Sequence, residues 1–364
     1  MMNQGYISGR QFMILVILFM MGNAVLLTPT IVIDSAKQDA WIAAALGLVE
    51  GVVIALLYDA IGRRFPGKTP IEFTGEILGN WMGKMVSFLF FTFAFIDTIL
   101  MLNQVGDFIT TYILVETPIQ AILLLFSIVL IFGVRLGIEP LARAAELLFP
   151  WVVALFLILI LTLAPEMKGV RLEPILAEGV KPVLEGNIRY VAFIFETVIW
   201  FMVFPAFTRA KATKKPFLIG MIVANLLLVM MNAVSVSVLG ADIAKLYNYT
   251  PFKLAQRISL GQFVERVEVI VAGIWFITLF IKTAISFYAS AFSLALVFRL
   301  KDYRPLTMPL GLIMIPLSLI FVPNILYLTT FTKLIWPPFT ATFGVLLPVL
   351  LLGAAILRRK GTSA

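Results

Sequence analysis

The sequence contains no cysteine and no histidine. These two absences exclude disulfide bonds, thiolate or imidazole metal sites, and catalysis that depends on a Cys–His or Ser–His pair. Charged residues are also scarce, at 13% of the 364 residues. The sequence shows no phosphate-binding loop, paired-carboxylate hydrolase pattern or cluster of metal ligands. We therefore expect a protein that is not an enzyme and that needs no metal or other cofactor.

Apolar residues make up 61% of the chain, and the mean hydropathy is +1.03. Soluble domains usually hold about 45–50% apolar residues. Apolar runs of about 20 residues recur along the whole length, as a helix crossing a hydrocarbon core of about 30 Å requires. We therefore predict an all-α polytopic membrane protein surrounded by a lipid bilayer. The net charge of +8 is then explained by Lys and Arg beside the spans, rather than by a nucleic-acid surface.

Ten transmembrane helices are predicted. They cover residues 11–33, 40–61, 82–112, 118–134, 140–163, 188–208, 216–240, 266–298, 306–328 and 334–357. The first run has no small-residue cleavage site before Pro29, so we interpret it as a span and not as a signal peptide. The loops on the side of the membrane that holds the N-terminus contain more Lys and Arg than the loops on the other side. This bias predicts that both termini are cytoplasmic. The stretches 71–78 and 251–260 are predicted to lie on the membrane surface.

The longest hydrophilic stretch, residues 164–187, separates two groups of five spans. An odd number of spans in each group places the two groups in opposite orientations, which is typical of the inverted repeats of secondary transporters. We therefore predict a single transmembrane permease-like domain over residues 1–364. Its first repeat covers about 11–163, and its second repeat follows the external loop and covers about 188–357.

The first span contains Gly22, Asn23 and Ala24 near mid-membrane, followed by Thr28 and Pro29. A helix broken here exposes backbone groups that hydrocarbon cannot satisfy but a ligand or a cavity can. The alternative is a tight helix crossing at the glycine with a proline kink downstream. The residues alone leave both interpretations open.

Three ionisable residues lie deep within predicted spans: Asp97, Glu196 and Lys282. A charged group in the bilayer core is costly, so each should face protein or water. Asp97 either contacts a ligand or bonds to a neighbouring helix. Glu196 either takes up a proton, pairs with a base, binds an ammonium group, or is a protonated structural residue. Lys282 either replaces a coupling cation or pairs with an acid such as Glu196 or Asp97, in a pair that is functional or merely structural.

Other polar residues within the spans are interpreted by their spacing. Ser286, Ser290 and Ser293 follow Lys282 at helical intervals, so this stripe should not face lipid. Glu50, Asn225 and Asn232 are predicted to form hydrogen bonds between helices.

Several short segments, by their order and spacing, resemble the spore germination permease family. They are residues 22–29, 78–84, 142–146 with 149–150, 195–196, and 254–259 with 280–282. The resemblance extends over nearly the whole chain. Members of this family are the B subunits of germinant receptors, within the amino acid–polyamine–organocation superfamily.

The resemblance implies a leucine-transporter-like fold, in which broken spans 1 and 6 surround a central site that spans 3 and 8 complete. It also implies partner A and C subunits, the inner spore membrane as the location, and small nutrients, commonly amino acids, as the signals. Carried over residue by residue, the implied ligand site comprises Gly22, Asn23, Ala24, Asp97, Met101, Glu196, Thr197, Thr283 and Phe287. The amides at the break in span 1 would hold a ligand carboxylate, and Lys282 and Glu196 would act as proton or cation-surrogate groups. Span 6 departs from the family pattern because it has no glycine beside Glu196.

The leading hypothesis is a nutrient-sensing subunit that binds a small amino acid or similar solute at mid-membrane and signals to its partners. The first alternative is an autonomous proton-coupled amino acid transporter. The second is a structural subunit that anchors partners without binding a ligand. Uptake of labelled amino acid by the chain alone distinguishes the first alternative from the hypothesis, and substitution of Gly22 distinguishes the second.

Overall fold

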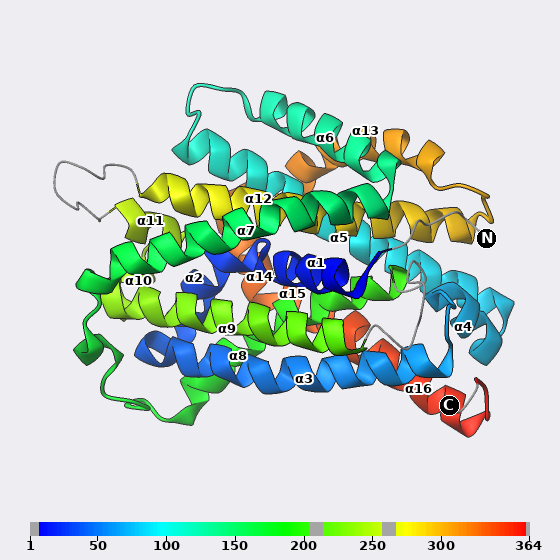
Figure 1. The fold of residues 1–364 in the computed structure, drawn as a ribbon, viewed down its shortest axis with the longest axis horizontal. Helices are drawn as coiled ribbons and strands as arrows, with labels where there is room; N and C mark the ends of the chain where they lie inside the picture. The colour runs from blue at the N-terminus through cyan, green and yellow to red at the C-terminus, as the bar shows by residue number, and fades with distance from the viewer. Residues whose placement is uncertain (1–6, 204–213, 257–266, 362–364) are drawn as a thin grey trace.

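The computed structural model describes residues 7–203, 214–256 and 267–361, and long helices run side by side along its longest axis (Figure 1). In these ranges, eight stretches of helix are long and apolar enough to cross a membrane. The chain is therefore a multi-pass α-helical membrane protein, as its composition predicted.

The continuous spans correspond to eight of the ten predicted ones. They are α3 (Ala40–Arg64), α5 (Asn80–Tyr112), α6 (Ile119–Leu136), α7 (Ile138–Leu163), α9 (Lys214–Leu239), α12 (Glu268–Val297), α13 (Arg304–Phe321), and the run of α15 (Trp336–Ala341), η8 (Thr342–Leu346) and α16 (Leu347–Leu357). The shorter connecting helices are η1 (Lys37–Asp39), η2 (Ala164–Glu166), η3 (Gly169–Leu172), α10 (Ala241–Ala244) and α14 (Ile325–Leu334).

The other two predicted spans, 11–33 and 188–208, are each broken. The first consists of α1 (Gly9–Met21) and α2 (Ala24–Ala36), which meet at Gly22 and Asn23. The second consists of α8 (Val180–Phe195) and the 3₁₀ helix η4 (Glu196–Met202). Residues 204–208 of this span lie outside the described residues. Each predicted half of the chain thus opens on a discontinuous span, while the boundaries of the two repeats remain a prediction.

Helix α8 begins at Val180, within the stretch 164–187 that was predicted to be an external loop. The first turns carry the exposed ion pair Lys181–Glu185 on one face, and they bury Val183 and Asn187 on the other. Hydropathy alone places the start of the span too late because half of each early turn is polar.

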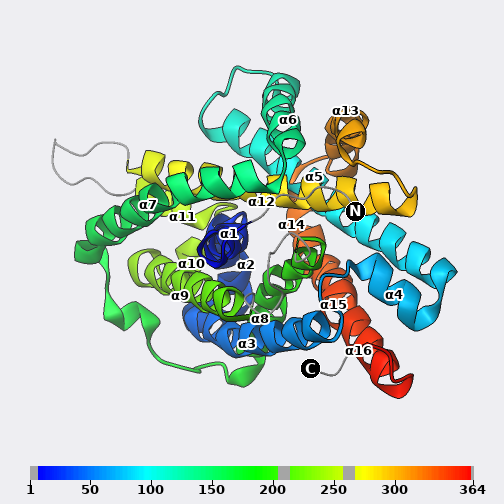
Figure 2. The same cartoon turned by 45° about the vertical axis from the view of Figure 1, so that its right-hand side comes forward.

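The broken first span lies in the middle of the bundle (Figure 2). Helix α1 contacts α7, α9 and α12, whereas α2 contacts α8 and α9. Every residue from Ile14 to Met21 is buried as a result. A break in this span therefore opens toward protein on all sides and not toward lipid.

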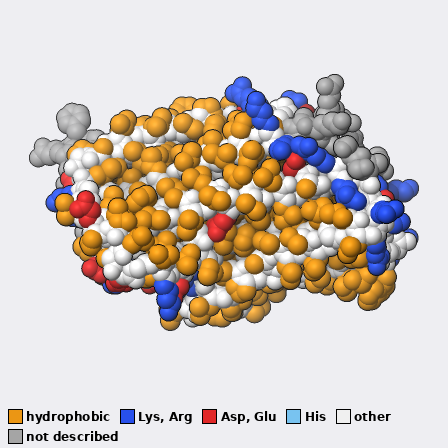
Figure 3. Space-filling view, turned by 90° about the horizontal axis from the view of Figure 1, so that it is seen from below, with side chains coloured by type: hydrophobic (Ala, Val, Ile, Leu, Met, Phe, Trp, Pro, Cys, Tyr) orange, Lys and Arg blue, Asp and Glu red, His pale blue; other side chains and the backbone are white. Residues whose placement is uncertain are grey.

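Hydrophobic side chains cover the middle of the outer surface, and Lys and Arg gather at the end where α4 and α16 lie (Figures 1 and 3). Helix α4 (Pro70–Leu78) lies at this end, with Phe73 and Ile77 buried and Glu76 exposed. It begins at a capping box in which Thr69 and Glu72 bond to each other's backbone amides.

The other predicted surface segment contains α11 (Thr250–Gln256), and residues 257–260 of it are outside the described ranges. The side chains of Phe252, Leu254 and Ala255 are at most 2% exposed. The helix packs against α2, α9 and α12, so its apolar side chains face protein rather than lipid.

Hydrogen bonds between buried or half-buried polar side chains join the central helices. Asn187 donates to Glu50 at 3.0 Å, and Tyr190 donates to Asn225 at 2.9 Å. Asn232 donates to the hydroxyl of Thr28 at 3.2 Å. These contacts confirm that Glu50, Asn225 and Asn232 bond between helices.

Gly47 lets α3 pack closely against α8. A Cβ atom at this position would lie 2.2 Å from Cε1 of Tyr190, whose hydroxyl is already bonded to Asn225. We expect Gly47→Val to lower the free energy of unfolding by about 1–3 kcal/mol, because overpacking forces the helices apart. Unfolding of the purified protein in mixed micelles measures this. Gly62→Val on the same helix is the control, since nothing lies within 4 Å of its Cβ position, and an equal loss in both variants would contradict the prediction.

Candidate functional site

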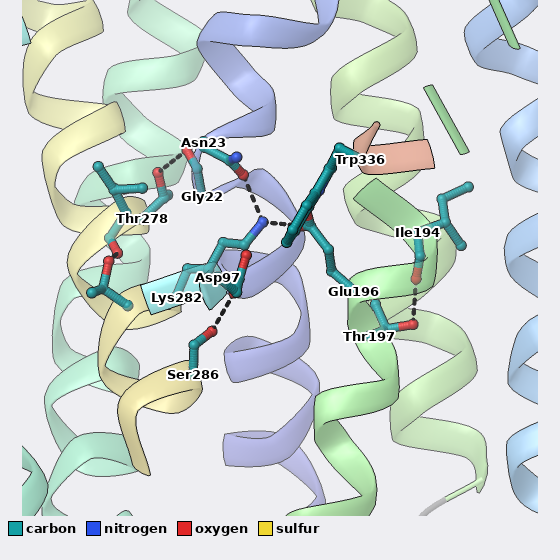
Figure 4. A network of polar contacts seen from close by, with 12 residues as sticks. Gly22, Asn23, Asp97, Ile194, Glu196, Thr197, Thr278, Lys282, Ser286 and Trp336 are labelled. Atoms are coloured by element: carbon teal, nitrogen blue, oxygen red, sulfur yellow. Dashed lines mark hydrogen bonds and ion pairs between the residues drawn. The ribbon is translucent and has the colours of Figure 1, made fainter. Parts of the chain in front are cut away.

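The break in the first span is built from Gly22 and Asn23. The amide of Gly22 closes α1 by donating to the carbonyl of Leu18 at 2.9 Å, and Asn23 begins α2 without a side-chain cap. The first amides of a helix have no acceptor within that helix. The carbonyl of Gly22 accepts a bond of 3.4 Å from Thr278 on α12 (Figure 4). The break therefore presents uncapped amides next to α12.

Lys282 of α12 reaches this break and connects it to η4. Its ammonium group forms an ion pair with Glu196 and donates to Oδ1 of Asn23 at 2.6 Å (Figure 4). The ammonium group also lies 5.2 Å from the ring centroid of Phe19, a distance at which a cation is attracted to the ring face. The side chains of Lys282 and Glu196 are 1% and 0% exposed. The sequence left Glu196 and Asp97 open as partners of Lys282, and in the structure Lys282 pairs with Glu196.

The second carboxylate oxygen of Glu196 accepts a hydrogen bond of 2.6 Å from the indole N–H of Trp336. Trp336 opens α15 and stacks on Phe93 of α5, with 9° between the ring planes. The tryptophan was not among the predicted site residues. The sequence indicates only weakly that Trp336 belongs to the site, because a tryptophan before two prolines at the start of a span is usually an interfacial anchor.

Asp97 of α5 lies beside Lys282, and its Oδ2 accepts a bond of 2.6 Å from Ser286 of α12 (Figure 4). Its Oδ1 is buried and has no hydrogen-bond partner among the described residues. The cluster of Asp97, Glu196 and Lys282 thus holds two acids and one base away from water. A buried charge without a partner is costly, so this arrangement favours a cationic group or a proton at Asp97.

The remaining predicted residues have different surroundings. Thr197 of η4 donates to the carbonyl of Ile194 in the preceding α8 at 2.5 Å, and Thr283 donates to the carbonyl of Leu279 within α12 at 2.7 Å. Figure 4 shows Thr197 turned away from Lys282. Phe287 lies against Gly311 of α13.

Two further predicted residues, Met101 and Ala24, are buried at 1% and 0% exposure. The structure therefore brings Gly22, Asn23, Asp97, Glu196 and Lys282 into one cluster, while the role of each predicted site residue in ligand binding remains a prediction. The predicted serine stripe is fully buried, which confirms that it does not face lipid.

Comparison with known sequences identifies relatives along most of the chain. The profile of a family described as "Spore germination protein" matches residues 6–326. Spore germination protein KB of Bacillus subtilis (strain 168) is 31% identical over 328 residues, which is 89% of this chain and 87% of that protein. Spore germination protein YndE of the same strain is 25% identical over 313 residues, covering 84% of each chain.

Comparison with solved structures identifies the fold. Mhp1, a nucleobase-cation-symport-1 family transporter solved in a closed conformation with bromovinylhydantoin bound, aligns with a TM-score of 0.74. The alignment covers 98% of this chain and 80% of the transporter at 12% sequence identity. The likeness confirms a leucine-transporter-like fold for this chain.

Proposed function

This chain belongs to the spore germination protein family, and on that premise we propose that it is the nutrient-sensing subunit of a germinant receptor. It binds a small amino acid or similar solute at mid-membrane and signals to partner A and C subunits in the inner spore membrane, with both of its termini cytoplasmic. The observation that carries the proposal is the meeting of a broken span, α1–α2, with the buried charges of α5, η4 and α12.

The chemistry of the cluster suits a zwitterion. The uncapped amides at the start of α2, together with Lys282, attract a carboxylate, because helix N-termini carry partial positive charge. The unpartnered Oδ1 of Asp97 accepts from an ammonium group. An amino acid brings both charges at once, so its entry satisfies Asp97 and leaves the net charge of the site unchanged.

A ligand at this position would compete for the bonds that join the surrounding helices. Lys282 connects α12 to Asn23 and Glu196, and Glu196 connects η4 to Trp336 on α15. A ligand carboxylate that draws Lys282 away from Glu196 weakens this chain of bonds. Binding then shifts the balance between two arrangements of the broken spans, and the partner subunits respond to that shift.

The proposal predicts the effect of Asp97→Asn. Hydrogen bonds to charged groups contribute about 1.5–3 kcal/mol, so the affinity for the amino acid should fall by about 10- to 100-fold. A thermal-shift screen of the purified protein against amino acids, sugars and nucleosides first identifies the ligand, because binding to the native state raises the melting temperature. Titration of both proteins with that ligand then gives the two affinities.

Two controls make this test specific. An analogue of the ligand that lacks the amino group should bind Asp97→Asn at least as tightly as it binds the natural chain. Asp107→Asn changes an acid on the same helix that is bonded by Tyr249, and it should leave the affinity unchanged. Unaltered binding of the amino acid by Asp97→Asn would contradict the role given to this carboxylate.

The likeness to a transporter favours a second candidate function, an autonomous proton-coupled amino acid transporter in which Glu196 and Lys282 handle the proton. Uptake of labelled ligand by the chain alone in liposomes would support this candidate. Binding without uptake supports the sensor. Failure to bind any nutrient, with normal assembly of the receptor, would leave the role of a structural anchor.

A further inference from the structure

A hollow of about 1060 Å³ lies at the end of the bundle that also holds the start of α1 and the end of α16. Its walls are formed by α4, the first turns of α5, and the end of α12 with the residues that follow it (Figure 1). Ile71 and Leu296 contribute apolar surface to these walls. This hollow, which we call the basic hollow, lies far along the bundle from the cluster around Lys282.

The charges that line the basic hollow do not cancel. Glu76 is paired with Lys68, and Glu72 accepts from the backbone of Thr69 at 2.8 Å in the capping box. Three exposed bases remain without an acidic partner among the described residues. They are Lys84, Arg299 and Lys301. The hollow therefore presents unpaired positive charge from α5 and from the segment that follows α12, and this charge is complementary to an anion.

Exposed aromatic side chains place the basic hollow at the membrane–water boundary. Trp81 is 73% exposed and lies one turn before Lys84, and Phe298 is 63% exposed and directly precedes Arg299. Tryptophan is enriched at the level of the lipid headgroups, so Trp81 marks that level at this end of the span. Leu300, beside them, is 39% exposed. A ligand at this level meets bases on one side and apolar side chains on the other.

We propose that the basic hollow binds the headgroup of an anionic phospholipid. Lys84, Arg299 and Lys301 hold the phosphate, and an acyl chain lies along Phe298 and Leu300. An acidic protein segment fits the charge but not the exposed apolar residues at the same level. A free phosphate lacks the acyl chain that those residues would cover.

The test uses the purified full chain in detergent. Added phosphatidylglycerol should raise the melting temperature, and phosphatidylcholine at the same concentration should not. Glycerol 3-phosphate, which carries the headgroup chemistry without acyl chains, should bind at least tenfold more weakly than phosphatidylglycerol. The double variant Lys84→Gln/Arg299→Gln should lower the affinity for phosphatidylglycerol by about thirtyfold, as expected for two bases removed from an anionic surface.

The matched control is Arg359→Gln/Lys360→Gln. It removes one Arg and one Lys from exposed positions at the same end of the bundle, and Arg359 shares the left-handed backbone of Arg299, with φ of 51° and 56°. This variant should bind phosphatidylglycerol like the natural chain. Equal losses in the two variants would show a general attraction to charge, and an equal response to both lipids or to glycerol 3-phosphate would exclude a phospholipid site. Each of these results would overturn the proposal.

Discussion

Lys282→Met should lower the free energy of unfolding by about 3–5 kcal/mol, because it leaves a carboxylate of Glu196 buried without its partner. The ammonium group is also the donor to Asn23, so the break between α1 and α2 loses a bond to α12. Methionine retains the unbranched apolar stem of lysine and lacks only its last heavy atom. The loss therefore reports on charge and hydrogen bonding rather than on a cavity. Unfolding of the purified protein in mixed micelles measures the change.

The double variant Lys282→Met/Glu196→Gln should recover most of the lost stability, because it removes both charges and keeps the side-chain volumes. Lys333→Met is the matched control. Lys333 is paired with Asp34 at 2.9 Å, but it is 22% exposed and Asp34 keeps a second partner in Arg189. Exposed pairs contribute about 0–1 kcal/mol, so this variant should be mild. Equal losses for Lys282→Met and Lys333→Met would refute the description of Lys282–Glu196 as a buried ion pair.

The positions of the spans could be predicted from the sequence because a bilayer sets a single requirement on length and polarity. The same requirement made Asp97, Glu196 and Lys282 conspicuous as exceptions, and all three are buried in the centre of the molecule. The choice between Glu196 and Asp97 as the partner of Lys282 stayed open. Helical spacing gives the face on which a side chain lies, but the neighbouring helix is set by packing across the whole chain.

The sequence indicated the break in the first span more clearly than the break at Glu196. Gly22 and Asn23 are poor helix formers, so their place in an apolar run indicated the first break. Around Glu196 the sequence has neither glycine nor a nearby proline, and α8 nevertheless changes to a 3₁₀ helix there. Trp200 of η4 packs edge-on against Phe12 and Phe19 of α1, with ring centroids 5.1 Å and 5.4 Å away. We infer that tertiary packing, which a local pattern cannot reveal, holds this second break.

Gly22→Val should abolish the response to the nutrient. A Cβ atom at this position would lie 2.4 Å from Cδ of Lys282 and 2.9 Å from the carbonyl oxygen of Phe19. A long side chain often moves aside, but Lys282 is held at its tip by Asn23 and Glu196, and the carbonyl belongs to the backbone of α1. The valine must therefore displace the ion pair or separate α1 from α12. Either change destroys the arrangement to which the ligand would bind.

Ligand titration of the purified variant and germination of spores that carry it give two independent measurements. Gly22→Ala should have the same effect to a smaller degree, because its single methyl group meets the same atoms. Gly353→Val in α16 is the control, since nothing lies within 4 Å of its Cβ position, and it should bind and respond normally. A Gly22→Val protein that assembles with its partners and still responds to the nutrient would exclude the break in the first span as the ligand site. The role of structural anchor would then explain the chain better, because the buried charges would serve only to hold the broken spans together.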